Sequence, residues 1–150
     1  MTKTVEARVT HRFRASAERV FDAWLRPDMV RAWGQRPLPG MGPMDVRRVE
    51  IDPRVGGKFT FSDMRPDGEA VHWGYYLDID RPRKLVFSWF TSEEDEQENN
   101  SVVTLTIEPR ADGCDATIVH RMDAKWAEYV ERTETGWGGM LQQIDGFFSS

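Results

Sequence analysis

The chain of 150 residues has little cysteine, no long hydrophobic run and no excess of positive charge. The single cysteine, Cys114, excludes an intrachain disulfide and a zinc site built from cysteines. A mean hydropathy of −0.59, without a long apolar run, excludes a membrane-spanning helix. The net charge of −5 disfavours nucleic-acid binding, because phosphate contacts need a basic surface.

The sequence also lacks the short motifs of common catalytic and cofactor sites. None of the patterns HExxH, GxxxxGK[ST], GxGxxG and GxSxG occurs, so neither a cofactor nor a metal is expected. The three histidines fall on three different predicted strands, which disfavours a shared metal site. The first residues contain no apolar segment of the signal-peptide type, so a cytoplasmic protein is expected.

Aromatic residues, by contrast, are plentiful. Six Trp, eight Phe and three Tyr give the chain enough apolar surface for a core. The length suits a single domain over residues 1–150.

Hydrophobic periodicity places the first elements. Residues 5–14 alternate between apolar and polar side chains, which predicts a half-buried strand. Ser16 is then expected to be the N-cap of a short helix, whose apolar residues recur at helical spacing up to Leu25. A second short helix is expected over 28–33, and the Pro and Gly content of 35–43 predicts a loop.

The rest of the chain reads as strands followed by one helix. Alternating patterns predict strands at 45–51, 58–63, 71–79, 85–89, 103–107 and 116–122. The acidic segment 91–100 predicts a solvated loop between two of them. From 126 to 148, apolar residues recur every three or four positions, which predicts one long amphipathic helix.

Three glycines interrupt this last helix at Gly136, Gly138 and Gly139. Each costs about 1 kcal/mol relative to alanine in a helix interior. We expect that the sheet or a ligand approaches closely there, because the apolar period continues through the glycines; the alternative is that the helix breaks. The segregation of helices from strands predicts an α+β fold. Its antiparallel sheet of about six to seven strands would curve around the C-terminal helix, with two short helices after the first strand.

Five motifs, in order along the chain, resemble those of one protein family. They are VFDAW at 20–24 with Pro27-Asp28 and Trp33, DPRVGG at 52–57, Gly74 with LVFSW at 85–89, His120 at a strand end, and Gly136-Trp137 with Leu141 and Ile144. They resemble the C-terminal domain of the activator of the 90-kDa heat-shock chaperone ATPase and its homologues. This family lies within the START-like (SRPBCC, birch-allergen-like) superfamily. The resemblance spans residues 5–148 and implies the helix-grip fold, in which the first and last strands pair.

The first functional hypothesis is a binding module for a small hydrophobic molecule. Such a ligand would occupy a cavity between the sheet and the C-terminal helix, lined by aromatic rings and a few polar anchors. The expected lining residues are His11, Trp24, Trp33, Phe59, Phe61, Trp73, Tyr75, Phe87, Trp89, His120, Trp137 and Leu141. The alternative is that these side chains fill a solid core.

Two other hypotheses stay open. The resemblance implies a possible chaperone partner, with a protein-interaction role. Some members of the wider superfamily are enzymes that cyclise, hydrate or hydrolyse substrates in the same pocket, and His11, His120 and Tyr75 would then be the groups to test. His11 and His120 share the apolar face of the paired first and last strands, so they are expected to lie near each other. An exposed strand edge or the 35–43 loop would also allow a homodimer.

Overall fold

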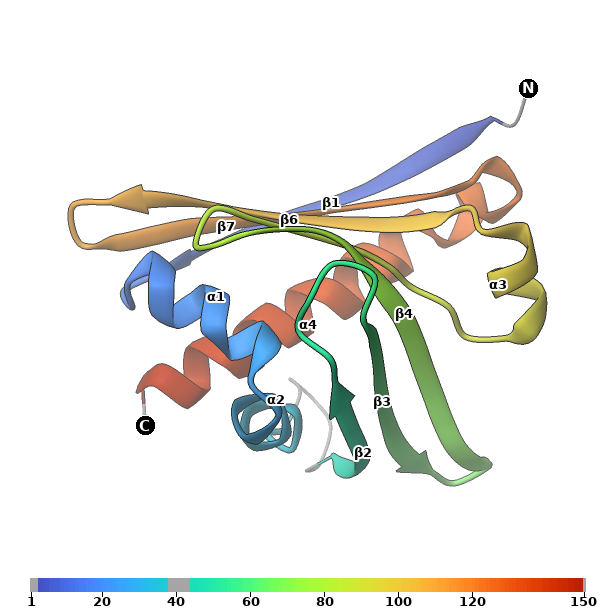
Figure 1. The fold of residues 1–150 in the computed structure, drawn as a ribbon, viewed down its shortest axis with the longest axis horizontal. Helices are drawn as coiled ribbons and strands as arrows, with labels where there is room; N and C mark the ends of the chain where they lie inside the picture. Colours follow the sequence, from blue (N-terminus) through green and yellow to red (C-terminus); the bar gives the residue numbers. More distant parts are fainter. Residues whose placement is uncertain (1–2, 38–43, 150) are drawn as a thin grey trace.

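The computed structural model describes residues 3–37 and 44–149, in which seven antiparallel strands curve around a long C-terminal helix (Figure 1). The elements are β1 (Thr4–Phe13), α1 (Ala17–Leu25), α2 (Pro27–Gly34), β2 (Asp45–Ile51), β3 (Lys58–Arg65), β4 (Gly68–Asp80), β5 (Lys84–Ser88), α3 (Glu93–Glu98), β6 (Ser101–Arg110), β7 (Gly113–Asp123), the 3₁₀ helix η1 (Ala124–Tyr129) and α4 (Val130–Ser149). The predicted α+β helix-grip architecture is confirmed. Residues 38–43 of the predicted loop lie outside the described residues.

The sheet has the order β1-β7-β6-β5-β4-β3-β2, so the first and last strands of the chain are neighbours. Ala7 lies opposite His120, and His11 lies opposite Ala116. The pairing that the resemblance implies is therefore confirmed. In Figure 1, α4 crosses beneath the long strands, with α1 and α2 near its C-terminal end and α3 beyond its N-terminal end. No helix of the described chain is long and apolar enough to cross a membrane.

The two short helices close one end of the fold. The Ser16 hydroxyl accepts a hydrogen bond from Arg19 N at 3.3 Å and so caps α1, as its sequence position predicts. Buried Gln143 of α4 donates to the backbone oxygen of Arg36 at 2.6 Å. The Gln143 bond holds the C-terminal half of α4 against the end of the helical layer.

The face of β4 that points inward differs from the prediction. Trp73 and Tyr75 were expected in the cavity, but the inward residue is Tyr76, which is 3% exposed. Its neighbour Leu77 is 49% exposed. Trp73 and Tyr75 lie on the outer face, where both donate to Glu96. The alternation in this strand was therefore interpreted one residue out of phase.

A bulge and a glycine explain the misleading pattern of β4. The register shifts between Tyr76 and Asp78, so Ile79 returns to the core although Leu77 points outward. Gly74 faces the backbone of Ser88, and a Cβ at this glycine would overlap the Ser88 carbonyl oxygen. The inner face of β4 thus carries a glycine where the sequence pattern led us to expect an aromatic side chain.

Residues 93–98 of the acidic segment form the short helix α3 where a loop was predicted, and none of the residues of α3 is buried. Ser92 caps α3 by accepting from Asp95 N at 3.2 Å, and four acidic residues occupy its first turn, where the helix dipole favours them. Glu96 accepts from Trp73 Nε1 and from the Tyr75 hydroxyl, both at 2.8 Å. These two bonds attach α3 to the outer face of β4. The acidic composition predicted repulsion between the carboxylates and gave no sign of the hydrogen bonds from Trp73 and Tyr75.

The C-terminal helix begins later than its hydrophobic period suggests. Residues 124–129 form the 3₁₀ helix η1, with non-helical backbone angles at Trp126, and α4 proper starts at Val130. Asp123 caps η1 by accepting from Lys125 N at 3.0 Å. As a result, the first aromatic residues of the predicted helix sit on a separate turn at the end of the sheet.

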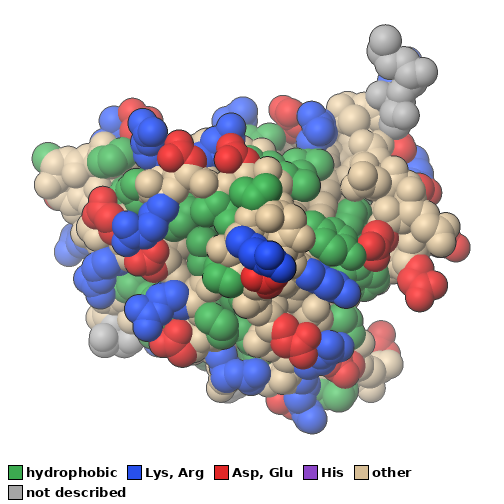
Figure 2. Space-filling view, viewed as in Figure 1, with side chains coloured by type: hydrophobic (Ala, Val, Ile, Leu, Met, Phe, Trp, Pro, Cys, Tyr) green, Lys and Arg blue, Asp and Glu red, His purple; other side chains and the backbone are tan. Residues whose placement is uncertain are grey.

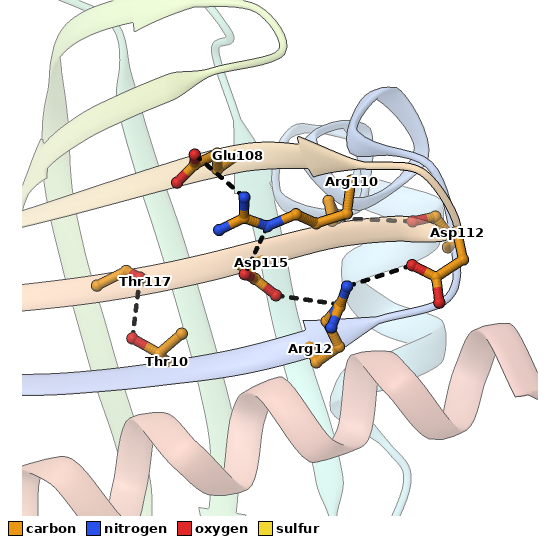
Figure 3. Close-up of polar contacts among 9 residues, drawn as sticks. Thr10, Arg12, Glu108, Arg110, Asp112, Asp115 and Thr117 are labelled. Atoms are coloured by element: carbon orange, nitrogen blue, oxygen red, sulfur yellow. Dashed lines mark hydrogen bonds and ion pairs between the residues drawn. The ribbon is translucent and has the colours of Figure 1, made fainter.

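The outer face of β1, β7 and β6 is polar. Asp115 bridges Arg12 at 3.2 Å and Arg110 at 2.9 Å, and Asp112 pairs with Arg12 at 3.2 Å (Figure 3). Exposed ion pairs of this type contribute about 0–1 kcal/mol each. These ion pairs indicate that this surface is a solvated face.

Candidate ligand-binding site

A cavity of about 340 Å³ opens at the end of the sheet, between α3, η1 and the first turns of α4. We call it the outer pocket. Its lining residues come from two stretches of the chain, 89–101 and 120–140: Trp89, Thr91, Asp95, Glu98, Asn100, Ser101, His120, Met122, Asp123, Trp126, Tyr129, Thr133, Gly136, Trp137 and Met140. Trp126 and Tyr129 are 39% and 38% exposed, so large aromatic surfaces border it.

A second, smaller cavity of about 60 Å³ lies deeper, among core side chains. We call it the inner pocket. Its lining is almost entirely apolar: Trp24, Val30, Trp33, Val49, Ile51, Phe59, Thr60, Phe61, Tyr76, Leu85, Phe87, Trp89, Trp137 and Met140. Trp89, Trp137 and Met140 line both pockets and therefore separate them. The indole nitrogen of Trp24 is buried without a hydrogen-bond partner among the described residues.

Most of the sequence-predicted cavity residues line one of these two pockets. His120 lines the outer one, Trp89 and Trp137 line both, and five aromatic residues line only the inner one: Trp24, Trp33, Phe59, Phe61 and Phe87. Both interpretations of the aromatic residues thus hold in part. The inner rings nearly fill their space, whereas the outer end is open. That any of them contacts a ligand stays a prediction.

Four predicted residues lie elsewhere. Leu141 is fully buried core, and Trp73 and Tyr75 lie on the outer face of β4. His11 binds Asp145 of α4, with His11 Nε2 to Asp145 Oδ2 at 2.8 Å. The structure does not bring the three candidate catalytic groups His11, His120 and Tyr75 into one site.

The two histidines expected to be neighbours lie apart along β1 and β7. His120 is opposite Ala7, four residues along β1 from His11, which is roughly 13 Å at the usual rise of a strand. His72 stacks on Trp89, with 4.9 Å between the ring centroids. Burial lowers the pKa of His72. Among the described residues, no three metal-ligating side chains gather in one place.

His120 is the polar centre of the outer pocket. It is 5% exposed, and its Nδ1 accepts a hydrogen bond from Trp137 Nε1 at 3.1 Å. Its Nε2 lies 2.7 Å from the hydroxyl of Ser101. Burial lowers the pKa of His120 to about 4, so the imidazole is neutral at pH 7. His120 is thus an uncharged polar group in the lining of the outer pocket.

The rim of the outer pocket is acidic. Asp95, Glu98 and Asp123 line it, and among the residues that the structure describes no Lys or Arg does. The ammonium group of Lys125 lies outside the lining and binds Glu98 at 2.7 Å. Figure 2 shows acidic side chains over α3 with hydrophobic ones beside them. The potential at this rim therefore disfavours an anionic ligand.

Sequence reasoning missed most of the rim, although one signal was present. Within the described part of the chain, a Cβ added at Gly136 would meet nothing within 4 Å, and at Gly138 it would meet only Val9, at an ordinary 3.8 Å. The expected close approach of the sheet is thus not found at these two positions. Gly136 instead leaves open space where α4 borders the pocket.

The same fold occurs in solved bacterial structures. Protein CV1439 of Chromobacterium violaceum is 22% identical, with a TM-score of 0.76 over 95% of both chains. NE0264 of Nitrosomonas europaea is 14% identical, with a TM-score of 0.78 over 97% of this chain and 94% of that one. Ms6760 of Mycobacterium smegmatis is 23% identical, with a TM-score of 0.72 over 99% and 92%. At these identities the likeness shows the fold alone.

Sequence comparison gives the family as well. The family described as "Activator of Hsp90 ATPase homolog 1-like protein" matches residues 14–149. None of the curated proteins matches the chain.

Proposed function

This chain belongs to the family of Activator of Hsp90 ATPase homolog 1-like proteins, and we propose that it binds a small apolar or aromatic molecule in the outer pocket. The observation that carries the proposal is the open cavity of about 340 Å³ itself. Small-molecule sites typically measure about 300–1,000 Å³ and combine apolar walls with a few polar groups. Trp89, Trp126 and Trp137 supply such walls, and His120 with Ser101 supplies the polar group.

Replacing Gly136 with phenylalanine is expected to close the outer pocket. The new side chain would leave the helix where nothing lies within 4 Å, so the fold tolerates it while the ring occupies ligand space. N-phenyl-1-naphthylamine, an uncharged probe that fluoresces in apolar sites, should bind the wild-type chain. Its affinity should fall by about tenfold or more in Gly136→Phe, a loss of about 1.4 kcal/mol.

The matched control is Gln142→Phe, which adds the same ring to an exposed position of α4 outside both pockets. Its probe affinity should equal that of the wild type, and both variants should give native circular dichroism. Absence of probe binding to the wild-type chain, or equal binding by Gly136→Phe, would contradict the proposal.

Whether the protein binds a small molecule or forms a homodimer can be measured on the purified chain. Native mass spectrometry is expected to show a bound small molecule as an excess of a few hundred daltons over the denatured mass. The same spectrum reports whether a homodimer forms. A chaperone partner, suggested by the family's description, stays a prediction, and stimulation of the chaperone ATPase by this chain is its test.

A further inference from the structure

The hydrogen bonds around His120 have only one consistent direction. The indole of Trp137 is a donor without an acceptor, so His120 Nδ1, 3.1 Å away, must accept and carries no proton. The neutral imidazole has one proton, which therefore resides on Nε2. Nε2 lies 2.7 Å from Ser101 Oγ, so His120 donates to that hydroxyl.

The chain of donors ends in the outer pocket. A hydroxyl that accepts a hydrogen bond still has its own proton to donate, and Ser101 lines the pocket at the start of β6. The adjacent rim residues are occupied with each other, since Asn100 Nδ2 donates to Asp123 Oδ2 at 3.2 Å. Donation from His120 polarises the Ser101 hydroxyl and makes it a better donor. The Ser101 hydroxyl thus presents an oriented O–H donor to the pocket.

The charge of the rim restricts what can accept this proton. Asp95 and Asp123 line the pocket, and no Lys or Arg is among its described lining residues, so a carboxylate ligand would meet repulsion. A cation cannot accept the Ser101 proton. The group that accepts from Ser101 is therefore uncharged, and the apolar body that carries it can pack on Trp89 and Trp137.

We propose that the ligand is an uncharged apolar molecule bearing a carbonyl oxygen, and that this oxygen accepts a hydrogen bond from Ser101. The inference rests on the proposed function and adds the chemical class of the ligand. It makes Ser101 the residue that distinguishes a ketone or ester from a hydrocarbon of the same shape.

Three naphthalene probes of similar size test the proposal by displacing N-phenyl-1-naphthylamine. They are 2-acetylnaphthalene with a carbonyl, 2-ethylnaphthalene without an acceptor, and 2-naphthoate with a negative charge. Ser101→Ala is expected to weaken 2-acetylnaphthalene about fivefold, the scale of one hydrogen bond, and to leave 2-ethylnaphthalene unchanged. Ser101→Thr keeps the hydroxyl and should retain the acetyl affinity. The naphthoate should bind most weakly to the wild-type chain.

The outcomes separate the two proposals. If none of the uncharged probes binds the wild-type chain, the proposed function itself fails. If acetyl and ethyl probes bind, but Ser101→Ala changes both affinities equally or neither, the pocket is a binding site and the role of Ser101 is refuted. Tight binding of the naphthoate would likewise refute the uncharged class. Because Ser101→Ala removes the acceptor of buried His120, thermal unfolding of each variant must first show that it is folded at the assay temperature.

Discussion

Replacing Trp137 with alanine is expected to lower the free energy of unfolding by about 3–5 kcal/mol, the range for removal of a large buried aromatic side chain. The indole is 4% exposed and lies at the centre of a ring cluster, 5.0 Å from Trp89 and 6.3 Å from both Trp24 and Phe87 between centroids. Its removal would merge the two pockets into one cavity and leave His120 Nδ1 without its donor. Urea unfolding followed by circular dichroism measures the loss.

Two further variants distinguish the contribution of the packed Trp137 ring from that of the hydrogen bond made by its indole nitrogen. Trp137→Phe keeps most of the packing but removes the donor to His120, so we expect a loss of about 1–3 kcal/mol, the cost of leaving a buried polar atom unpaired. Trp126→Ala removes the same residue type from a site that is 39% exposed, and it should cost less than about 1 kcal/mol. Equal losses in Trp126→Ala and Trp137→Ala would show that Trp137 is not the centre of the core.

The order of the strands and of the long helix could be predicted from the sequence because most of these elements have a clear hydrophobic period. The alternation of 5–14 and the helical spacing of 130–148 both match the structure, since one face of each element is buried and the other is wet. The pairing of the first strand with the last is not visible in either segment. It came from the resemblance to a family, since long-range pairing leaves no local pattern.

The site was harder to predict, for reasons that particular residues illustrate. Trp73 and Tyr75 are residue types that are common in protein cores, but both donate hydrogen bonds to Glu96 on the outer side of β4. Tryptophan and tyrosine each combine an apolar body with a donor, so hydrophobicity alone does not decide their direction. Gly136 was conspicuous in the sequence, yet the reason for it, an open pocket rather than a close neighbour, requires the three-dimensional arrangement.

Ser101 could not have been identified from the sequence. A serine at the start of a predicted strand is common, and its importance comes from a histidine 19 residues away and an indole on another element. Whether these side chains meet depends on the register in which β6 pairs with β7. Ser101 pairs with Met122 across the β6–β7 ladder, which brings its side chain beside His120.

Acidification to pH 4 is expected to destabilise the protein, with His120 contributing about 3 kcal/mol of the loss. The pKa of His120 is about 4 in the folded chain, against 6.5 as its ordinary value. Between these values the unfolded chain binds the proton and the folded chain does not, so stability falls as the pH falls from 6.5 to 4. A difference of about 2.5 pKa units corresponds to about 3 kcal/mol. Below pH 4 both states bind the proton and this contribution stops growing.

The variant that isolates the contribution is His120→Gln. A glutamine amide offers one acceptor for Trp137 and donors for Ser101, but it does not titrate. Urea unfolding at pH 7 and pH 4 should show a loss in the wild type that exceeds the loss in His120→Gln by about 3 kcal/mol. Carboxylates and His72 titrate in both proteins, so their contributions cancel in this difference. Equal losses in the two proteins would mean that His120 can take a proton in the folded state, and its assignment as a neutral acceptor for Trp137 would be wrong.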